Sequence, residues 1–180
     1  NYKEKENGSC CLERLNMDLC HFSVRSGNHG EDAAAWAKML LSMYEKYFEK
    51  QGWAVTEKTI ELSSIPEGIE QCCMTVDGDR KKLDCEAGIH RLVRISPYDP
   101  EKRRITCFAA VGLDDYQVTD QMIENKYWED IVRSYFFYPE KRVKDARNGL
   151  IEDDIDKVLD GEIEDFITAE LIRRERNAKL

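Results

Sequence analysis

The first half of the chain alternates apolar and polar residues in patterns typical of strands arranged around one amphipathic helix. Residues 17–25 alternate and predict a strand. Residues 32–51 repeat apolar side chains at helical spacing, and Gly52 ends the pattern. The other predicted strands are 53–62, 69–78, 90–96 and 103–112. We therefore expect an α+β fold over residues 17–112, an antiparallel sheet with a long helix packed on it.

The second half of the chain has a different pattern. Residues 113–127 are acidic and polar, and predict a short connector. Residues 128–180 end in two amphipathic segments separated by Gly161, and predict a C-terminal helical region that packs on the core. Residues 1–16 are polar and predict a flexible N-terminal segment.

Length and composition favour one ordinary domain with a small appendage. The chain has 180 residues, of which 42% are hydrophobic, so it can form a substantial core. No apolar run approaches the roughly 20 residues that span a bilayer, and we expect no membrane partner. The sequence starts at Asn1 rather than Met, so the lack of a targeting segment carries no information.

Seven cysteines occur, an odd number without Cys-x-x-Cys spacing. This pattern lacks the ligand pairs of a structural zinc site, and it favours free thiols in a reducing intracellular compartment. We expect neither a metal nor a cofactor.

Charge is distributed unevenly along the chain. The net charge is −9, which argues against general nucleic-acid binding and leaves only a local patch for that purpose. Residues 80–104 hold eight basic and four acidic residues, a net charge of +4. On a regular strand Arg91 and Arg94 point to opposite faces, so we expect the basic residues to gather around the turn. From composition alone, a solvated hairpin that guards a sheet edge is as good an interpretation as an RNA-binding one.

One segment resembles a known family. Residues 86–108, EAGIHRLVRISPYDPEKRRITCF, resemble the codon-recognition segment of bacterial-type class I peptide chain release factors of the Ser-Pro-Phe type. Residues 27–53 are similar to the Gly-rich turn and following helix of the family, and residues 128–149 to its C-terminal region. The resemblance covers most of residues 19–172, and it implies the fold of the codon-side core of a release factor.

Three departures from the family pattern stand out. The chain has no Gly-Gly-Gln tripeptide, and only about 15 residues stand where the family has the domain that carries it. The family uses that loop in peptidyl-tRNA hydrolysis, so we expect no enzymatic activity. Tyr98 replaces the family Phe, and Ile105 replaces a His that stacks on the codon. In the helix-start turn His29 replaces a Gly and Asp32 replaces a Glu. The family's N-terminal helical domain is not found in this sequence.

The resemblance implies a degenerate paralogue that binds RNA without reading a stop codon. In its loss of both tripeptide motifs the chain resembles plastid release-factor paralogues that stabilise a photosynthetic mRNA through the 3′ untranslated region, and this resemblance implies the chloroplast stroma as its location. The expected RNA-binding residues are Arg80, Lys81, Lys82, His90, Arg91, Arg94, Ser96, Pro97, Tyr98, Lys102, Arg103, Arg104 and Thr106. The expected helix-start turn comprises Asn28, His29, Gly30 and Asp32.

Several alternatives stay open at this point. Tyr98 either stacks on a base or packs the turn, and His90 is better explained by structural hydrogen bonds at a strand end. The chain is alternatively a ribosome-associated factor that docks in the decoding region. A third interpretation is a protein-interaction module that uses the acidic residues 152–164 or the aromatic residues 134–139. The sequence does not indicate an oligomeric state.

Overall fold

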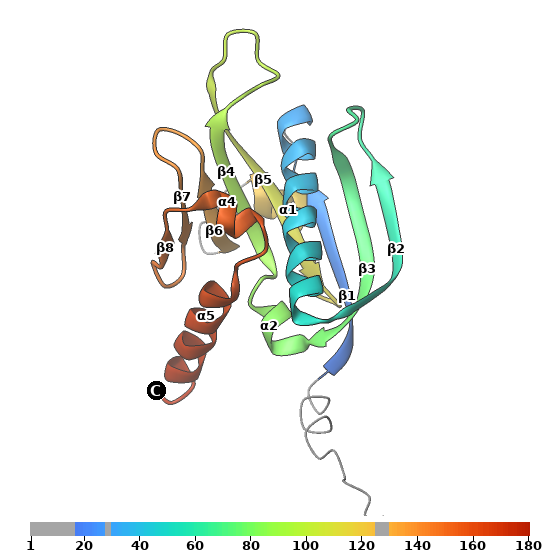
Figure 1. The fold of residues 1–180 in the computed structure, drawn as a ribbon, viewed down its shortest axis with the longest axis vertical. Coiled ribbons are helices and arrows are strands. Elements are labelled where there is room, and N and C mark those ends of the chain that lie inside the picture. The colour runs from blue at the N-terminus through green and yellow to red at the C-terminus, as the bar shows by residue number, and fades with distance from the viewer. Residues whose placement is uncertain (1–16, 28–29, 125–129) are drawn as a thin grey trace, which may run out of the picture.

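A single eight-stranded sheet organises the molecule (Figure 1). The structure is a computed structural model that describes residues 17–27, 30–124 and 130–180. The strands are β1 (Met17–Ser26), β2 (Ala54–Leu62), β3 (Ile69–Asp79), β4 (Gly88–Ile95), β5 (Arg104–Leu113), β6 (Ile131–Phe136), β7 (Arg142–Asp145) and β8 (Ile151–Glu152), and their order in the sheet is β2-β3-β1-β5-β4-β6-β7-β8.

Helix α1 (Gly30–Gln51) lies along one face of this sheet (Figure 1). Its apolar stripe includes Trp36, Leu40 and Tyr44, all fully buried in the main core. Such a stripe at helical spacing stabilises the helix mainly through burial against the strands. The helix ends where Gly52 takes a φ of +70°, a left-handed conformation that glycine adopts at little cost.

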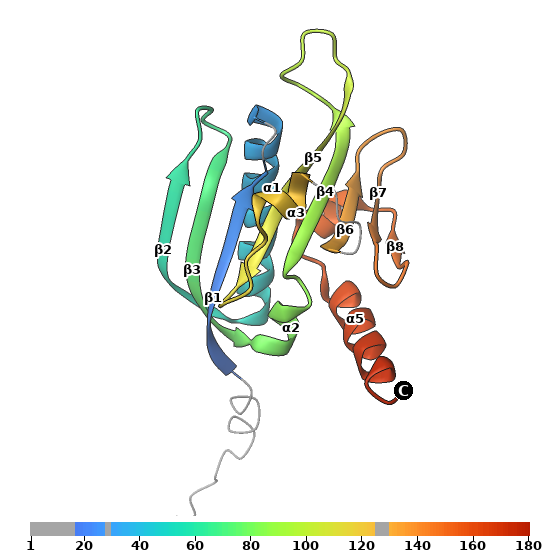
Figure 2. The same cartoon turned by 180° about the vertical axis from the view of Figure 1, so that it is seen from behind.

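The opposite face of the sheet, called the back face below, has a smaller core of its own (Figure 2). Helix α3 (Asp120–Glu124) covers part of it and buries Ile123 there. Val118, from the segment before α3, joins Ile89, Phe108 and Ile131 in the same cluster. Residues 113–127 were predicted to be a plain connector, but they contain a short helix. Their apolar residues Val118 and Ile123 are buried in this core although the surrounding sequence is acidic and polar.

The prediction for the C-terminal part needs correction. Instead of a wholly helical region, residues 130–180 add three strands to the sheet before helices α4 (Ile155–Leu159) and α5 (Glu164–Asn177). Strand β6 pairs with β4 in parallel, so the sheet is mixed and not wholly antiparallel. A parallel strand flanked by neighbours on both sides is buried on both faces, and five of the six residues of β6 are buried.

A buried ion pair joins the added strands to the rest of the molecule. Two nitrogens of Arg133 on β6 donate to the carboxylate of Glu86, at 2.6 and 3.0 Å, and both side chains are almost completely buried. Glu86 lies in the turn between α2 (Arg80–Asp84) and β4. Tyr44 of α1 donates to the same carboxylate at 2.8 Å, so three elements meet at Glu86.

Helices long and apolar enough to cross a membrane are not found among the described residues.

Candidate nucleic-acid interface

The β4–β5 hairpin projects beyond the N-terminal end of α1 and ends in a loop, residues 96–103, called the tip loop below (Figure 1). The backbone N–H of Ser96 donates to the carbonyl of Arg103 at 3.0 Å and closes the loop. Within it, Asp99 accepts from the backbone N–H of Glu101 at 3.0 Å and from the guanidinium of Arg103 at 2.6 Å. These bonds give the loop a defined shape even though most of its residues are exposed.

Asp32 in the first turn of α1 connects the helix to the tip loop. One carboxylate oxygen accepts from Arg94 at 2.7 Å, and the other accepts from the hydroxyl of Ser96 at 2.5 Å. The Ser96 hydroxyl in turn accepts from the backbone N–H groups of Tyr98 and Asp99, at 3.1 and 3.2 Å. The helix start and the Ser-Pro-Tyr turn are therefore one hydrogen-bonded unit, although 64 residues separate Asp32 from Ser96.

Tyr98 is held on its other side by a third segment. Its hydroxyl donates to Glu67, in the loop between β2 and β3, at 2.8 Å. Its ring centroid lies 5.9 Å from the guanidinium carbon of Arg94. Burial, followed by the hydrogen bond to Glu67, raises the pKa of Tyr98 to about 12, so the hydroxyl stays protonated and available as a donor.

An apolar groove of about 340 Å³ opens beside this unit. Its walls come from α1, the end of β4 and the segment after β6, and its lining residues are Met39, Arg94, Ile95, Pro97, Phe137 and Tyr138. Tyr138 is exposed, and Pro97 brings the Ser-Pro-Tyr turn into the groove wall. An aromatic and aliphatic groove with one guanidinium has the chemistry of a site for a planar base.

His90 is not part of this surface, which corrects its inclusion among the RNA-binding residues. The side chain is completely buried, and its Nε2–H donates to the backbone carbonyl of Glu86 at 2.8 Å. Burial is the main cause that lowers the pKa of His90 to about 4, so the ring is neutral at physiological pH. A buried structural hydrogen bond accounts for this residue.

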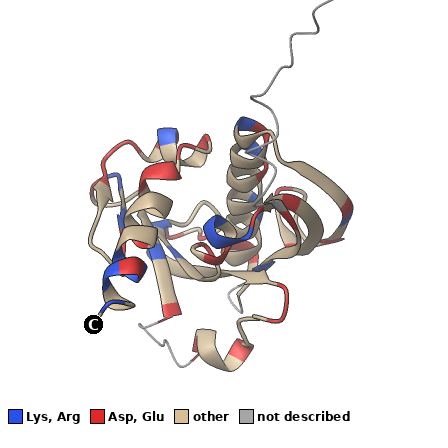
Figure 3. Ribbon diagram, turned by 90° about the horizontal axis from the view of Figure 1, so that it is seen from below, with Lys and Arg blue, Asp and Glu red and all other residues tan. Residues whose placement is uncertain are grey.

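The basic residues do not form one island. Arg80, Lys81 and Lys82 belong to α2, at the opposite end of β4 from the tip loop (Figure 1). Eight residues of β4 lie between the two ends, a length of roughly 25 Å. Arg80 pairs with Asp114 at 2.5 Å and Lys82 with Glu164 at 2.6 Å. Figure 3, which views the molecule from that end, shows acidic and basic residues intermixed. The basic residues of 80–104 are contiguous in sequence, but in the structure they form two groups, because the extended strand β4 lies between them.

Three other predicted residues lie on the back face. These residues are Arg91, Arg104 and Thr106. The register pairs Arg91 with Phe108, Val93 with Thr106 and Ile95 with Arg104, and side chains at these alternate positions point away from α1. Arg91 donates to Ser134 of β6 at 3.0 Å. The prediction that Arg91 and Arg94 face opposite ways is confirmed, because Arg94 binds Asp32 on the side of α1.

The rest of the predicted turn is seen only in part. Asn28 and His29 lie outside the described residues. Gly30 opens α1 with a φ of +63°, which favours glycine, and no atom lies within 4 Å of where its side chain would begin. Ile105 is partly buried and packs against the main core on the side of α1.

Sequence reasoning missed Glu67, whose role depends on a contact between two distant loops. It also missed Arg142 and Lys144 on β7, because the alternation in RVKD is only four residues long. Groups of three or more potential metal-binding side chains are not found in the part of the chain that the structure describes.

Comparison with known proteins defines the family. The family model for the PCRF domain matches residues 12–111, more than half of the chain, and the chain belongs to this family. With the relatives below, this places it in the class I peptide chain release factor family. Peptide chain release factor 2 of Borreliella burgdorferi is 35% identical over 125 residues, which cover 68% of this chain and 34% of that protein.

Two longer matches describe how the chain relates to its relatives. Peptide chain release factor 2 of Thermotoga maritima is 27% identical over 237 residues, covering 84% of this chain and 64% of that protein. RF2 of Thermus thermophilus has the same fold, with a TM-score of 0.74 and 26% identity over 89% of this chain and 69% of that chain. The chain spans about a third to two thirds of these curated relatives. The alignment of 237 residues is longer than the 180-residue chain, so that relative has internal residues without a counterpart here.

Proposed function

We propose that this protein is a non-catalytic, release-factor-like RNA-binding protein. We further propose that it binds and stabilises the 3′ untranslated region of a plastid photosynthetic mRNA, in the chloroplast stroma. The observation that carries the first part is the tip loop, which is held to α1 and exposes Lys102 and Arg103, next to the exposed Arg104 at the start of β5. The mRNA and the compartment are proposed from the resemblance to a plastid release-factor paralogue, because this chain also lacks Gly-Gly-Gln and has an altered Ser-Pro-Phe tripeptide.

The absence of peptidyl-tRNA hydrolysis belongs to the same proposal. The sequence has no Gly-Gly-Gln, and the Thermotoga maritima relative has internal residues without a counterpart in this chain. We expect no release of peptide from ribosomes programmed with a stop codon when this chain is added alone. Release above the level of a buffer control would contradict the proposal.

Electrostatic binding predicts a defined dependence on salt. If the tip loop and its neighbours neutralise about four phosphates of single-stranded RNA, the slope of log affinity against log salt is about −3. A bound protein of this kind protects the RNA by occupying the strand in front of an exonuclease. A slope near zero would contradict the electrostatic part of the proposal.

The identity of the RNA is tested by crosslinking in the native compartment, followed by sequencing of the bound RNA. Enrichment of a messenger 3′ untranslated region supports the proposal. Enrichment of ribosomal RNA supports the second candidate, a ribosome-associated factor that docks in the decoding region. That candidate is favoured by the fold shared with RF2 of Thermus thermophilus. Cosedimentation with ribosomes at physiological salt, without binding to free RNA, would establish it.

The protein-interaction module receives less support. The acidic segment 152–164 already pairs with lysines of the same chain, for example Asp160 with Lys46 at 2.7 Å and Glu162 with Lys50 at 2.5 Å. Of the aromatic segment 134–139, Tyr135 is fully buried in the core. A stable complex with another protein that hides the tip loop would revive this interpretation.

A further inference from the structure

The back face of the sheet carries a second group of basic residues, and those of β7 come from a strand that the sequence did not predict. Register aligns Thr106 of β5 with Val93, Val93 with Phe136 of β6, and Phe136 with Arg142 of β7. On one side of this row lies Arg104, paired with Ile95, and on the other lies Lys144, paired with Ser134. Residues that share a face in register lie about 5 Å apart from strand to strand, so this is a continuous surface.

Within residues 17–27, 30–124 and 130–180, the exposed cations of this surface have no carboxylate partner. Arg104, Arg142 and Lys144 are exposed, and ion pairs involving them are not found among the described residues. The paired positions of β4, β5, β6 and β7 that form this surface, from the Ile95–Arg104 pair to the Arg91–Phe108 pair, hold no Asp or Glu. This face is therefore locally positive, although the chain as a whole has a net charge of −9.

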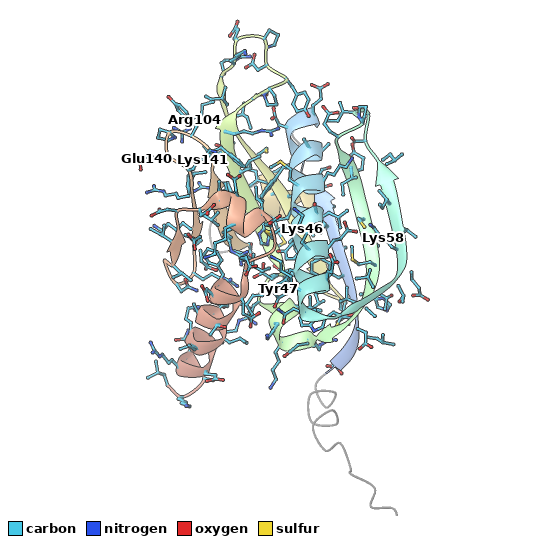
Figure 4. The ribbon with its side chains drawn as sticks, in the orientation of Figure 1. Lys46, Tyr47, Lys58, Arg104, Glu140 and Lys141 are labelled. Carbon is cyan, nitrogen blue, oxygen red and sulfur yellow. The ribbon has the colours of Figure 1, made fainter. Side chains whose placement is uncertain are left out.

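Cations are also crowded here. Burial, followed by the charge of Arg104, lowers the pKa of Arg91 from its ordinary value. Figure 4 shows Arg104 at the same end of the molecule as Lys141 and Glu140, which lie in the loop before β7. Lys141 lies 3.9 Å from Asp156, a distant ion pair. Basic residues held close together are costly unless an anion binds between them.

Phe136 positions two of the guanidinium groups. The guanidinium carbon of Arg91 lies 5.5 Å from the centre of its ring, and that of Arg142 lies 5.4 Å from it. A guanidinium stacked on an aromatic ring loses less freedom when it binds a phosphate, and its planar fork matches phosphate oxygens. The ring thus prepares the exposed Arg142 for an oxyanion, whereas Arg91 also donates to Ser134.

We propose that this part of the back face, formed by Arg104, Thr106, Phe136, Arg142 and Lys144, binds the sugar-phosphate backbone of single-stranded RNA. The proposal rests on the RNA-binding function proposed above and gives the RNA a path. Arg104 lies at the junction of the tip loop and the back face, so a strand held by Lys102 and Arg103 continues onto β5, β6 and β7. Exposed, separate cations along a flat strand surface fit a repeating anion better than a compact ligand.

The test is the affinity of the full chain for a fluorescent polyuridine of about 20 nucleotides, measured by anisotropy over a range of salt concentrations. The variant removes two charges, Arg142→Gln with Lys144→Gln. Each lost phosphate contact weakens binding roughly 5-fold at about 0.1 M salt, so we expect a roughly 25-fold loss and a salt slope less steep by about 1.4.

A matched control removes two exposed charges from the end of α5, Arg176→Gln with Lys179→Gln, and gives the same net charge. We expect its affinity to stay within about twofold of the wild type. Circular dichroism of both variants checks that they fold. Equal losses in both would show that only net charge matters, and would overturn the proposal.

The remaining outcomes separate this inference from the function on which it rests. One outcome is that the wild type binds polyuridine, the double variant Lys102→Gln with Arg103→Gln binds it more weakly, and the β7 variant binds it like the wild type. The RNA would then stay on the tip loop, and the inference would be wrong. If the wild type does not bind, the proposed function fails as well. Polyglutamate, added as a competitor, distinguishes binding of RNA from binding of any polyanion. If polyglutamate displaced polyuridine from the protein at an equal concentration of charge, the surface would not be specific for RNA.

Discussion

Strand β4 has an arginine–carboxylate network at each end, and the two networks differ in what surrounds them. At its start, the side chains of Arg133 and Glu86 are 0% and 1% exposed. At its end, those of Arg94 and Asp32 are 15% and 13% exposed, and the tip loop beyond them is mostly in solvent. The chemistry is the same, but the first network fixes strands to the core and the second positions a loop that is free to meet a ligand.

Burial decides how much each network contributes to stability. A charge left alone in the interior keeps its full cost of desolvation, whereas a charge near the surface recovers water. Burial alone would raise the pKa of Glu86, but Arg133 overrides it and the pKa is lowered. The pair is therefore ionised in the folded protein, and it is sensitive to the loss of either partner.

The largest expected effect is the loss of Arg133. We expect Arg133→Met to reduce the free energy of unfolding by about 3–5 kcal/mol, because Glu86 is left charged and buried. The measurement is urea unfolding at neutral pH, with Arg103→Met on the exposed tip loop as the control, expected to lose less than about 1 kcal/mol. Equal losses in the two variants would show that burial does not decide how much an arginine–carboxylate pair contributes to stability.

His90, beside the buried network, predicts a pH dependence. Its folded pKa of about 4 lies below the ordinary 6.5, so the unfolded chain takes up the proton first as pH falls. Its contribution to stability is complete above pH 6.5 and is lost as pH falls towards 4. Relative to His90→Gln, we expect the wild type to lose about 3 kcal/mol over that interval, at about 1.4 kcal/mol for each pH unit. Urea unfolding at several pH values measures the difference, and parallel curves for the two proteins would contradict it.

At the other end of β4, Asp32→Asn should have a smaller effect on stability and a clear effect on the loop. We expect a loss of about 1–2 kcal/mol, because Arg94 keeps access to water when its partner is neutralised. Amide exchange should become faster at Tyr98 and Asp99, whose N–H groups donate to Ser96. Asp32→Glu keeps the carboxylate and serves as the control. Unchanged exchange in the Asn variant would show that Asp32 does not hold the loop.

The two ends of β4 also show how far the sequence can predict this molecule. The strands of the first half were predicted to within a few residues, because their alternation is a local signal. Strand β6 was missed because Val132, Arg133 and Ser134 are all buried between two neighbours, which removes the alternation. Strand β7 has only four residues, too few for a pattern to stand out.

The candidate site was predictable as a set of residues but not as an arrangement. The resemblance named Asp32, Arg94, Ser96 and Tyr98, which the structure brings together. It also named His90, which is buried, and the basic residues of α2, which lie at the far end of β4. Nearness in sequence is a poor guide to nearness in space along an extended strand, because each residue adds about 3.3 Å.

The smallest predicted effect concerns the hydroxyl of Tyr98. In Glu67→Gln we expect the pKa of Tyr98 to fall from about 12 towards its ordinary value of 10, but only in part, because burial contributes more to the rise than Glu67 does. An NMR titration of labelled tyrosine measures it, with Tyr98→Phe to assign the signal. An unchanged pKa would mean that Glu67 does not hold the hydroxyl in solution. The ring would then be free to leave the turn and stack on a base, and the tip loop would be less rigid than the network at Asp32 requires.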